Sequence, residues 1–500
     1  MASTSLSLSF VETAPVPTLS VGQQQAIRLL PELGVLVTAS LLCMTLFSVG
    51  EYEAVSLLGP VVLILVTAVA NFRMVVADPA MLMTPLFGIR LTALVVFGGG
   101  ALFDMFSPLE EQLRRDSLYA ASVEEVARTN LLWLLSMTML LAGVALAMRF
   151  HRRSRAEPPA QDKAGAVPLT IGLWMFALSF AFITSKIILS IVTPIILPGI
   201  LENFVLAFEL CGMFLVAQHV GTSRVALFAV WVGMAAVILS SLLFTSKTLA
   251  LYPALMAMLG LLSKRMTWRR ALAGAALIML IFVVIAPIVT YSRDRIEREH
   301  GLGGSASISE RWSYIVDYAG GDRLREDTIA FTLSRLDYVM PASFVMSQHD
   351  QGLPSDDLAT AAFIFVPRLI WPDKPSTTDS GLEVNHLLGS QTTNQIGVTV
   401  FAHLYWSIGW YALVIAFVMG IYSGIVSLMC HAIIRRGDWL LIPFALSAMR
   451  TGLNLDDDFT GAWLAPAVIN LIMYFALTMA GRLLPRLAGG SPGSLVSVPR

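Results

Sequence analysis

Charged residues are scarce along the whole chain. Asp, Glu, Lys and Arg make up 13% of the 500 residues, hydrophobic residues make up 56%, and the mean hydropathy is +0.73. Because a soluble domain usually carries about 25% charged residues, this composition excludes an ordinary soluble protein. The 33 basic and 34 acidic residues nearly cancel, so nucleic acid is not an expected partner.

Cysteine and recognisable metal motifs are also lacking. Cys43, Cys211 and Cys430 each lie inside an apolar segment, without the spacing of a metal site or a disulfide framework. No HExxH motif or Cys/His cluster occurs, so the sequence predicts no metal and no other cofactor. The acidic stretch "LDDD" (455–458) is the one alternative for a metal site.

Long apolar runs are abundant instead, and they predict an all-α polytopic membrane protein. A helix needs about 20 residues to cross a bilayer. Twelve segments near this length are candidate spans: 31–50, 54–71, 83–103, 130–149, 168–190, 202–219, 225–245, 247–263, 271–290, 400–429, 438–454 and 461–482.

The basic residues between the spans predict the orientation. The clusters are "RFHRRSR" (149–155), "SKRMTWRR" (263–270), "RR" (435–436) and the pair Arg482 and Arg486. Even numbers of predicted spans separate them, so all four fall on one side. Short cytoplasmic loops carry an excess of Lys and Arg, which makes that side the cytoplasm and places both termini there.

One interspan segment is far longer than the others, and it divides the chain. A loop of this length is usually functional or disordered, and this one is too apolar for disorder. The predicted organisation is a cytoplasmic N-terminal tail (1–27), spans one to nine (28–290), a large periplasmic loop with short helices (291–400), spans ten to twelve (401–486) and a disordered cytoplasmic tail (487–500).

The long loop contains an unusual turn, "PRLIWPDKP" (367–375). Pro367 and Pro372 interrupt helix on either side of "RLIW". Trp371 is typical of a membrane interface. Arg368 offers a planar fork of donors for phosphate oxygens, and residue Lys374 adds a point charge. The turn is therefore either a rigid anion-binding element or a surface anchor whose cations reach ordinary lipid phosphates.

Four stretches in order resemble one family. They are "FTSKTLALYPALMAMLG" (244–260), "SRLDYV" (334–339), "PRLIWPDKP" (367–375) and "YWSIGWYA" (405–412), and together they cover roughly residues 240–430. This order is similar to the O-antigen polymerases, the Wzy-type polymerases of oligosaccharide repeat units. The chain departs from the pattern in "HLYWSIGW", which lacks the acidic residue and the asparagine that many relatives have there.

The resemblance implies a GT-C-like glycosyltransferase bundle in the bacterial inner membrane. Such an enzyme moves a growing glycan from undecaprenyl diphosphate to the next lipid-linked repeat unit on the periplasmic face, without a metal. Implied partners are this lipid-linked oligosaccharide, membrane lipids, a flippase and a chain-length regulator.

That chemistry needs cations for the leaving diphosphate and a base for the acceptor hydroxyl. The predicted bases are Asp337 and His403. The cation candidates on the outer side are Lys247, Arg293, Arg295, Arg335, Arg368, Lys374 and Arg450. We expect Lys247, Arg335 and Arg368 to converge in one cavity that opens toward the lipid.

Each of these candidates also has a simpler interpretation. Lys247 at a span end can reach the interface as any lysine does. Arg293 and Arg295 can belong to a solvated charge run, and Arg450 can pair with Asp456 or Asp457. The competing functions are an O-antigen ligase, a transporter or flippase of lipid-linked sugars, and a membrane scaffold.

Overall fold

All regular structure in the described residues is helical. The computed structural model describes residues 21–102, 121–150, 169–192, 199–264, 267–301, 306–320, 338–366, 371, 380–388 and 397–487. The prediction of an all-α chain is confirmed for these residues.

The long helices cover most of the candidate spans. Their bounds are α1 Val21–Ser48, α2 Tyr52–Ala77, α3 Pro85–Thr92, α6 Val123–Phe150, α7 Leu169–Val192, α8 Gly199–Gln218, α9 Arg224–Leu243, α10 Thr248–Lys264, α11 Trp268–His300, α18 Ala412–Arg436, α19 Ile442–Leu453 and α20 Ala465–Leu487. Short helices join them: η1 Pro79–Met83, η2 Ala93–Gly100, α12 Ile308–Gly320, α14 Val339–Asp350, α15 Asp357–Thr360, η4 Ala361–Phe365, α16 Ser380–Leu387, α17 Val400–Ile408, η5 Gly409–Tyr411, η6 Trp439–Leu441, η7 Asn454–Asp456 and η8 Phe459–Leu464.

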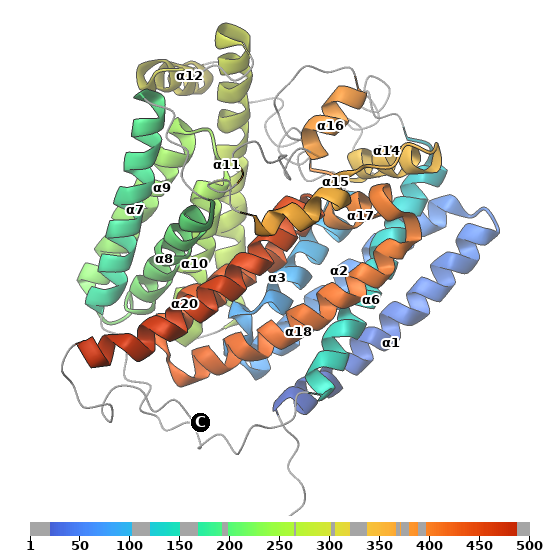
Figure 1. Ribbon diagram of the computed structural model, residues 1–500, viewed down its shortest axis with the longest axis horizontal. Helices are drawn as coiled ribbons and strands as arrows, with labels where there is room; N and C mark the ends of the chain where they lie inside the picture. The colour runs from blue at the N-terminus through green and yellow to red at the C-terminus, as the bar shows by residue number, and fades with distance from the viewer. Residues whose placement is uncertain are drawn as a thin grey trace, which may run out of the picture.

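One group of helices is built around α6 and α18. These two helices pack along each other, and α1 and α2 pack on α6 (Figure 1). The approach is close because glycines face backbone: a Cβ on Gly420 would lie 1.9 Å from the Leu140 carbonyl oxygen, and one on Gly143 would lie 2.2 Å from that of Phe417. Small residues at helix contacts are the usual way for membrane helices to approach closely.

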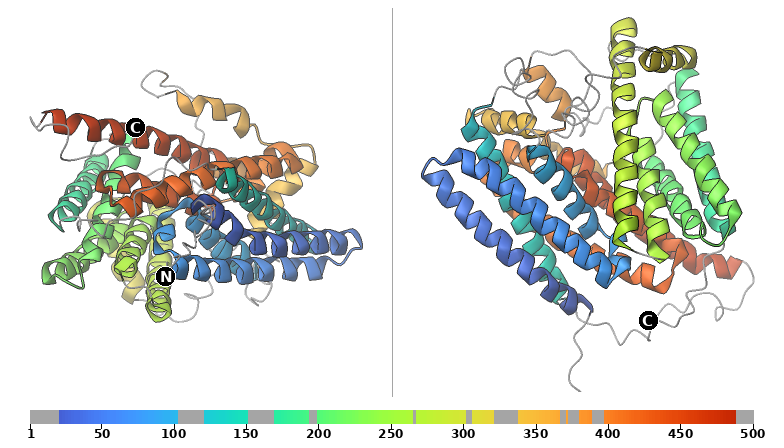
Figure 2. Two further views of the ribbon diagram at one scale, coloured as in Figure 1. Left: turned by 90° about the horizontal axis from the view of Figure 1, so that it is seen from below. Right: turned by 180° about the vertical axis from the view of Figure 1, so that it is seen from behind.

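A second group contains α7, α8, α9, α10 and α11. It stands beside the first group and is seen from behind in Figure 2. Helix α10 packs on α8, α9 and α11, and α8 also packs on α19 and α20 of the first group's side. The two groups are thus joined through α8, α19 and α20, while α2 and α11 form opposite walls of a cavity.

Seven helices in the described residues are long and apolar enough to cross a membrane. They contain α1, α2, α6, α9, α11, α17–α18 and η8–α20. Four shorter apolar helices, at 85–100, 169–185, 203–218 and 248–263, match further predicted spans. The chain therefore has the helices of a membrane protein, whereas the count of twelve spans remains a prediction.

Several boundaries differ from the sequence prediction. Helix α1 begins at Val21, inside the predicted polar tail, because Ala26 and Leu29 are buried against the bundle. Helix α11 continues to His300, ten residues past the predicted end of its span. Residues 291–300 contain no proline or glycine, and Gly301 then ends the helix at a φ of +76°.

Candidate functional site

A large cavity lies between the two helix groups. It encloses about 1810 Å³, with α2, α3 and η2 on one side and α10 and α11 on the other. Most of its wall is apolar and includes Phe72, Val76, Leu91, Leu255 and Phe282. A cavity of this shape suits a ligand with a long apolar part.

One end of this cavity is strongly polar. Three cations line it: Lys247, Arg293 and Arg311. Three carboxylates line it as well: Glu297, Asp456 and Asp457. The polar and apolar parts are continuous, so the cavity matches an amphiphile with a charged head and a long tail. We call the end lined by these six residues the polar end.

The cations are held at the C-terminal end of α9. Arg293 donates through Nε to the Thr245 carbonyl at 2.7 Å, and Arg311 donates to the Leu243 carbonyl at 3.2 Å. The last carbonyls of a helix lack intrahelical partners and carry partial negative charge, so they attract cations. Burial lowers the pKa of the Arg311 guanidinium, as expected for a cation taken out of water.

Lys247 follows directly after a strained turn. Thr245, which also lines the cavity, has a φ of +51°, a region that β-branched residues rarely occupy. Such strain costs about 1–3 kcal/mol and persists only where the surroundings impose it. Here the Thr245 carbonyl is the acceptor for Arg293, and the Lys247 ammonium lies 5.9 Å from the centre of the Phe282 ring. The turn therefore aims Lys247 at the cavity.

The carboxylates at the polar end belong to the broken connection between α19 and η8. Burial and the neighbouring Asp457 raise the pKa of Asp456 to about 6, and burial also raises the pKa of Asp457. The Tyr338 hydroxyl donates to Asp456 at 3.3 Å. A carboxylate whose pKa is close to neutrality can both accept and release a proton under physiological conditions.

Arg450 lies behind the cavity wall rather than in it. Its guanidinium stands 5.2 Å from the centre of the Tyr252 ring and donates to Asn203 at 3.3 Å. Tyr252 itself lines the cavity and donates to Asn454 at 2.8 Å. Arg450 can therefore position Tyr252, and its partners among the described residues differ from the aspartates weighed in the sequence.

His403 is buried, and protein groups occupy both of its ring nitrogens. The Phe459 backbone N–H donates to Nδ1 at 3.3 Å, so Nε2 carries the proton and donates to Asp357 at 3.2 Å. One of these bonds must break before His403 can accept a proton from a substrate. In this arrangement His403 holds the connection that carries Asp457 and Asp458, which is a positioning role.

Of the remaining predicted cations, Arg295 lies outside the cavity and the others lie outside the described residues. Arg295, two residues after Arg293, points elsewhere and pairs with Glu299 at 3.2 Å and the Tyr291 hydroxyl at 3.1 Å. Residues two apart on a helix face different directions, and here only Arg293 of the two lines the cavity. Arg335, Asp337, Arg368 and Lys374 lie outside the described residues, so the expected convergence of Lys247 with Arg335 and Arg368 stays a prediction.

Arg311 and Glu297 were missed by the sequence analysis. Both lie in the segment after the ninth predicted span, where charge is plentiful and no spacing distinguishes them. Arg311 reaches the cavity because α12 packs against α9 and α11. The amphipathic pattern "ISERWSYIVDY" (308–318) is consistent with helix α12. It does not predict where that helix packs.

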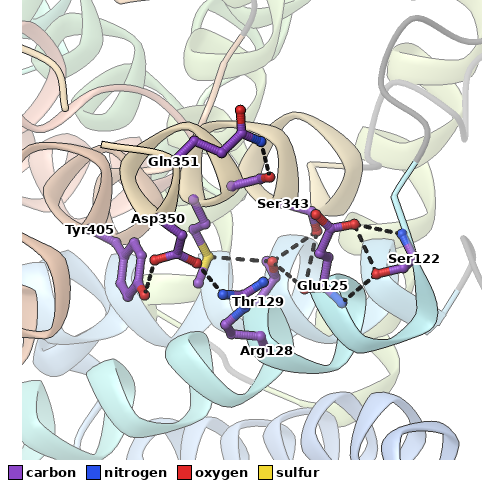
Figure 3. Close-up of polar contacts among 10 residues, drawn as sticks. Ser122, Glu125, Arg128, Thr129, Ser343, Asp350, Gln351 and Tyr405 are labelled. Carbon is purple, nitrogen blue, oxygen red and sulfur yellow. Dashed lines mark hydrogen bonds and ion pairs between the residues drawn. The ribbon is translucent and has the colours of Figure 1, made fainter. Parts of the chain in front are cut away.

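Polar contacts fix α14 to the bundle beside the cavity. The Arg128 guanidinium pairs with Asp350, and the Tyr405 hydroxyl donates to the same carboxylate at 3.0 Å (Figure 3). The hydroxyls of Thr129 and Ser343 lie 2.8 Å apart. These contacts join α14 to α6 and α17.

Tyr338 lies directly before α14, so the contacts that hold α14 also hold Tyr338 in place. Tyr338 lines the cavity, and its ring packs where a Cβ on Gly397 would be only 2.7 Å away. Glycine is thus required at 397 by close approach. Tyr338 and Asp456 are consequently held at the polar end from two separate segments of the chain.

The described residues contain no group of three or more His, Cys, Asp or Glu side chains arranged to hold a metal ion. The three consecutive aspartates 456–458 diverge: Asp458 caps η8 by accepting from the Gly461 N–H, while Asp456 faces Tyr338.

Fold and site together define a class: within the described residues, an all-α protein with helices long and apolar enough to cross a membrane and an amphiphilic cavity between two helix groups. No protein-family model, no curated protein and no solved structure matches the chain.

Proposed function

We propose that the protein is a membrane glycosyltransferase that polymerises oligosaccharide repeat units carried on undecaprenyl diphosphate. The observation that supports this most is the meeting of Lys247, Arg293 and Arg311 at the polar end of an apolar-walled cavity. A diphosphate bound there would face three cations, and its polyprenyl chain would lie along α2 and α11.

In this proposal the chain's own residues carry the reaction. The three cations stabilise the negative charge that develops on the leaving diphosphate. A carboxylate at the polar end accepts the proton from the acceptor hydroxyl, and Asp456 and Asp457 have suitably raised pKa values. Tyr338 and His403 hold these carboxylates in place.

The proposal includes a bacterial inner membrane location, with both termini in the cytoplasm and the polar end facing the periplasm. Labelling of single introduced cysteines in intact cells tests this: Pro354→Cys should react and Arg436→Cys should not. The three native cysteines are buried, which keeps the background low. A flippase and a chain-length regulator are the proposed protein partners.

Deletion of the gene in its host, followed by gel analysis of surface glycan, tests the reaction. Loss of long chains with single repeat units retained is the expected result. Loss of glycan from the lipid A core with long lipid-linked chains retained would instead identify a ligase. Complementation with Arg293→Gln should fail and with Arg295→Gln should succeed.

A transporter or flippase of lipid-linked sugars is the second candidate, because helices that line the cavity are interrupted. Helix α3 passes into the π-helical η2, and η7 separates α19 from η8. Discontinuous helices are typical of transporter binding sites. Accumulation of lipid-linked repeat units on the cytoplasmic face after deletion would favour this function over polymerisation.

A further inference from the structure

A second cavity lies at the opposite end of the helices and is lined mainly by α1 and α2. Figure 2 shows these two helices side by side. It encloses about 620 Å³ and is lined by the first turns of α1, the last turns of α2, and parts of α3 and α6. We call this the basic end of the bundle, because Arg28, Arg73, Arg149, Arg435 and Arg436 all lie there.

Three arginines and one glutamate line this cavity, which gives it a net charge of +2. Arg90 and Glu32 neutralise each other in a buried two-bonded pair between α3 and α1. Arg28 and Arg73 remain at the rim, where both are exposed, and neither has an ion-pair partner among the described residues. The unneutralised charge is therefore concentrated at the rim.

The wall that runs away from the two arginines is apolar and uncovered. Val35, Leu65 and Val69 are 51%, 60% and 50% exposed, and all three line the cavity. Both helices are apolar enough to cross a membrane. In a bilayer this wall contacts acyl chains, while Arg28 and Arg73 lie near the level of the headgroups.

We propose that this cavity binds an acidic phospholipid, with its phosphate between Arg28 and Arg73 and its acyl chains along α1 and α2. Basic pockets between membrane helices recognise anionic headgroups by charge, and apolar walls add the hydrophobic contribution of the chains. A soluble anion would use the arginines but would leave Val35, Leu65 and Val69 uncovered. The site is separate from the polar end, so it stands independently of the proposed reaction.

Native mass spectrometry of the purified full chain can measure the binding of phosphatidylglycerol and phosphatidylcholine with identical acyl chains. The variant Arg28→Gln/Arg73→Gln should lose roughly thirtyfold of the preference for phosphatidylglycerol. Arg28→Lys/Arg73→Lys should retain most of it. The matched control Arg149→Gln/Arg436→Gln removes two arginines from the same end but outside the cavity, and should lose less than about threefold.

Three results would overturn the proposal. The first is an unchanged preference in Arg28→Gln/Arg73→Gln. The second is an equal loss in the control pair, which would indicate general attraction to the basic end. The third is displacement of the lipid by inorganic phosphate at an equal concentration. Monodisperse elution and an unchanged melting temperature in phosphatidylcholine establish that each variant is folded.

Discussion

Helices α6 and α11 share great length and apolar character but lie in different surroundings. Both are long and apolar, yet 72% of the most apolar stretch of α6 is buried inside the protein, against 22% for α11. High hydropathy predicts that a helix is removed from water. It does not distinguish burial against other helices from exposure to lipid, because both environments are apolar.

This difference separates stability from function in the two helix groups. The large continuous core is centred on the group around α6 and α18 and extends to α8 and α10 of the second group, whose other buried clusters are small. The cavity lies where the two groups face each other, with α11 as its less buried wall. Changes around α6 should therefore unfold the protein, and changes at the polar end should alter its activity.

The largest effect is expected at the buried pair between α1 and α3. Glu32→Gln leaves Arg90 buried without its counter-charge and should lower the free energy of unfolding by about 3–5 kcal/mol. Thermal unfolding in detergent measures this. Glu53→Gln, an exposed carboxylate at the start of α2, is the control and should change little. Adding Arg90→Met to Glu32→Gln should recover much of the loss, and no recovery would contradict the role of the pair.

Gly420→Ala is the second substitution expected to destabilise the helix group around α6 and α18. The added Cβ would lie 1.9 Å from the Leu140 carbonyl, so α6 and α18 must separate, at a cost of about 3 kcal/mol. The control is Gly34→Ala, a helical glycine with open space around it, which should leave the melting temperature equal or slightly higher. Equal melting temperatures for both variants would show that the α6–α18 contact is less tight than described.

The polar end should respond in activity rather than stability. Arg293→Gln removes one cation from the proposed diphosphate site and should slow polymerisation of purified lipid-linked repeat units about 100-fold. Arg295→Gln is on the same helix, pairs with Glu299 and should stay within about twofold of the unchanged protein. If both variants lose the same activity, or if Arg293→Gln only lowers the melting temperature, then Arg293 merely caps α9.

The smallest expected effect is a pH dependence of stability. The pKa of Asp456 is raised to about 6 in the folded protein, above its value in the unfolded chain. The protonated form is therefore favoured by folding, and this contribution is complete below about pH 4 and lost as the pH rises through about 6. Asp456→Asn should raise the free energy of unfolding at pH 7.5 by about 2 kcal/mol or less and change little near pH 4. Identical gains at both pH values would contradict the shifted pKa.

Much of the fold could be predicted from the sequence, for a simple reason. Helix in an apolar setting is dictated locally, because every backbone group must find its partner within the segment. The long runs therefore predicted the apolar helices that the structure describes. Helix ends were less predictable: the charged residues 291–300 read as a loop, but nothing in them stops α11 before Gly301.

The candidate site was predictable only in part. Lys247 and Arg293 were identified by residue type and by their place at a span end, and both line the cavity. Arg295 has the same type and nearly the same place, and its helix face directs it away. Arg311 had no local signal, because its contribution depends on how α12 packs against α9.

The sequence by itself determined the apolar character and the secondary structure of this protein: apolar helices, few charges, and clusters of basic residues between the helices. Only the tertiary structure decided which apolar faces meet protein, which face lipid, and which charges share a cavity. The physical reason is one of range. Backbone hydrogen bonding and hydropathy act within a segment, whereas the polar end joins Lys247, Arg311 and Asp456 from three segments that only packing brings together.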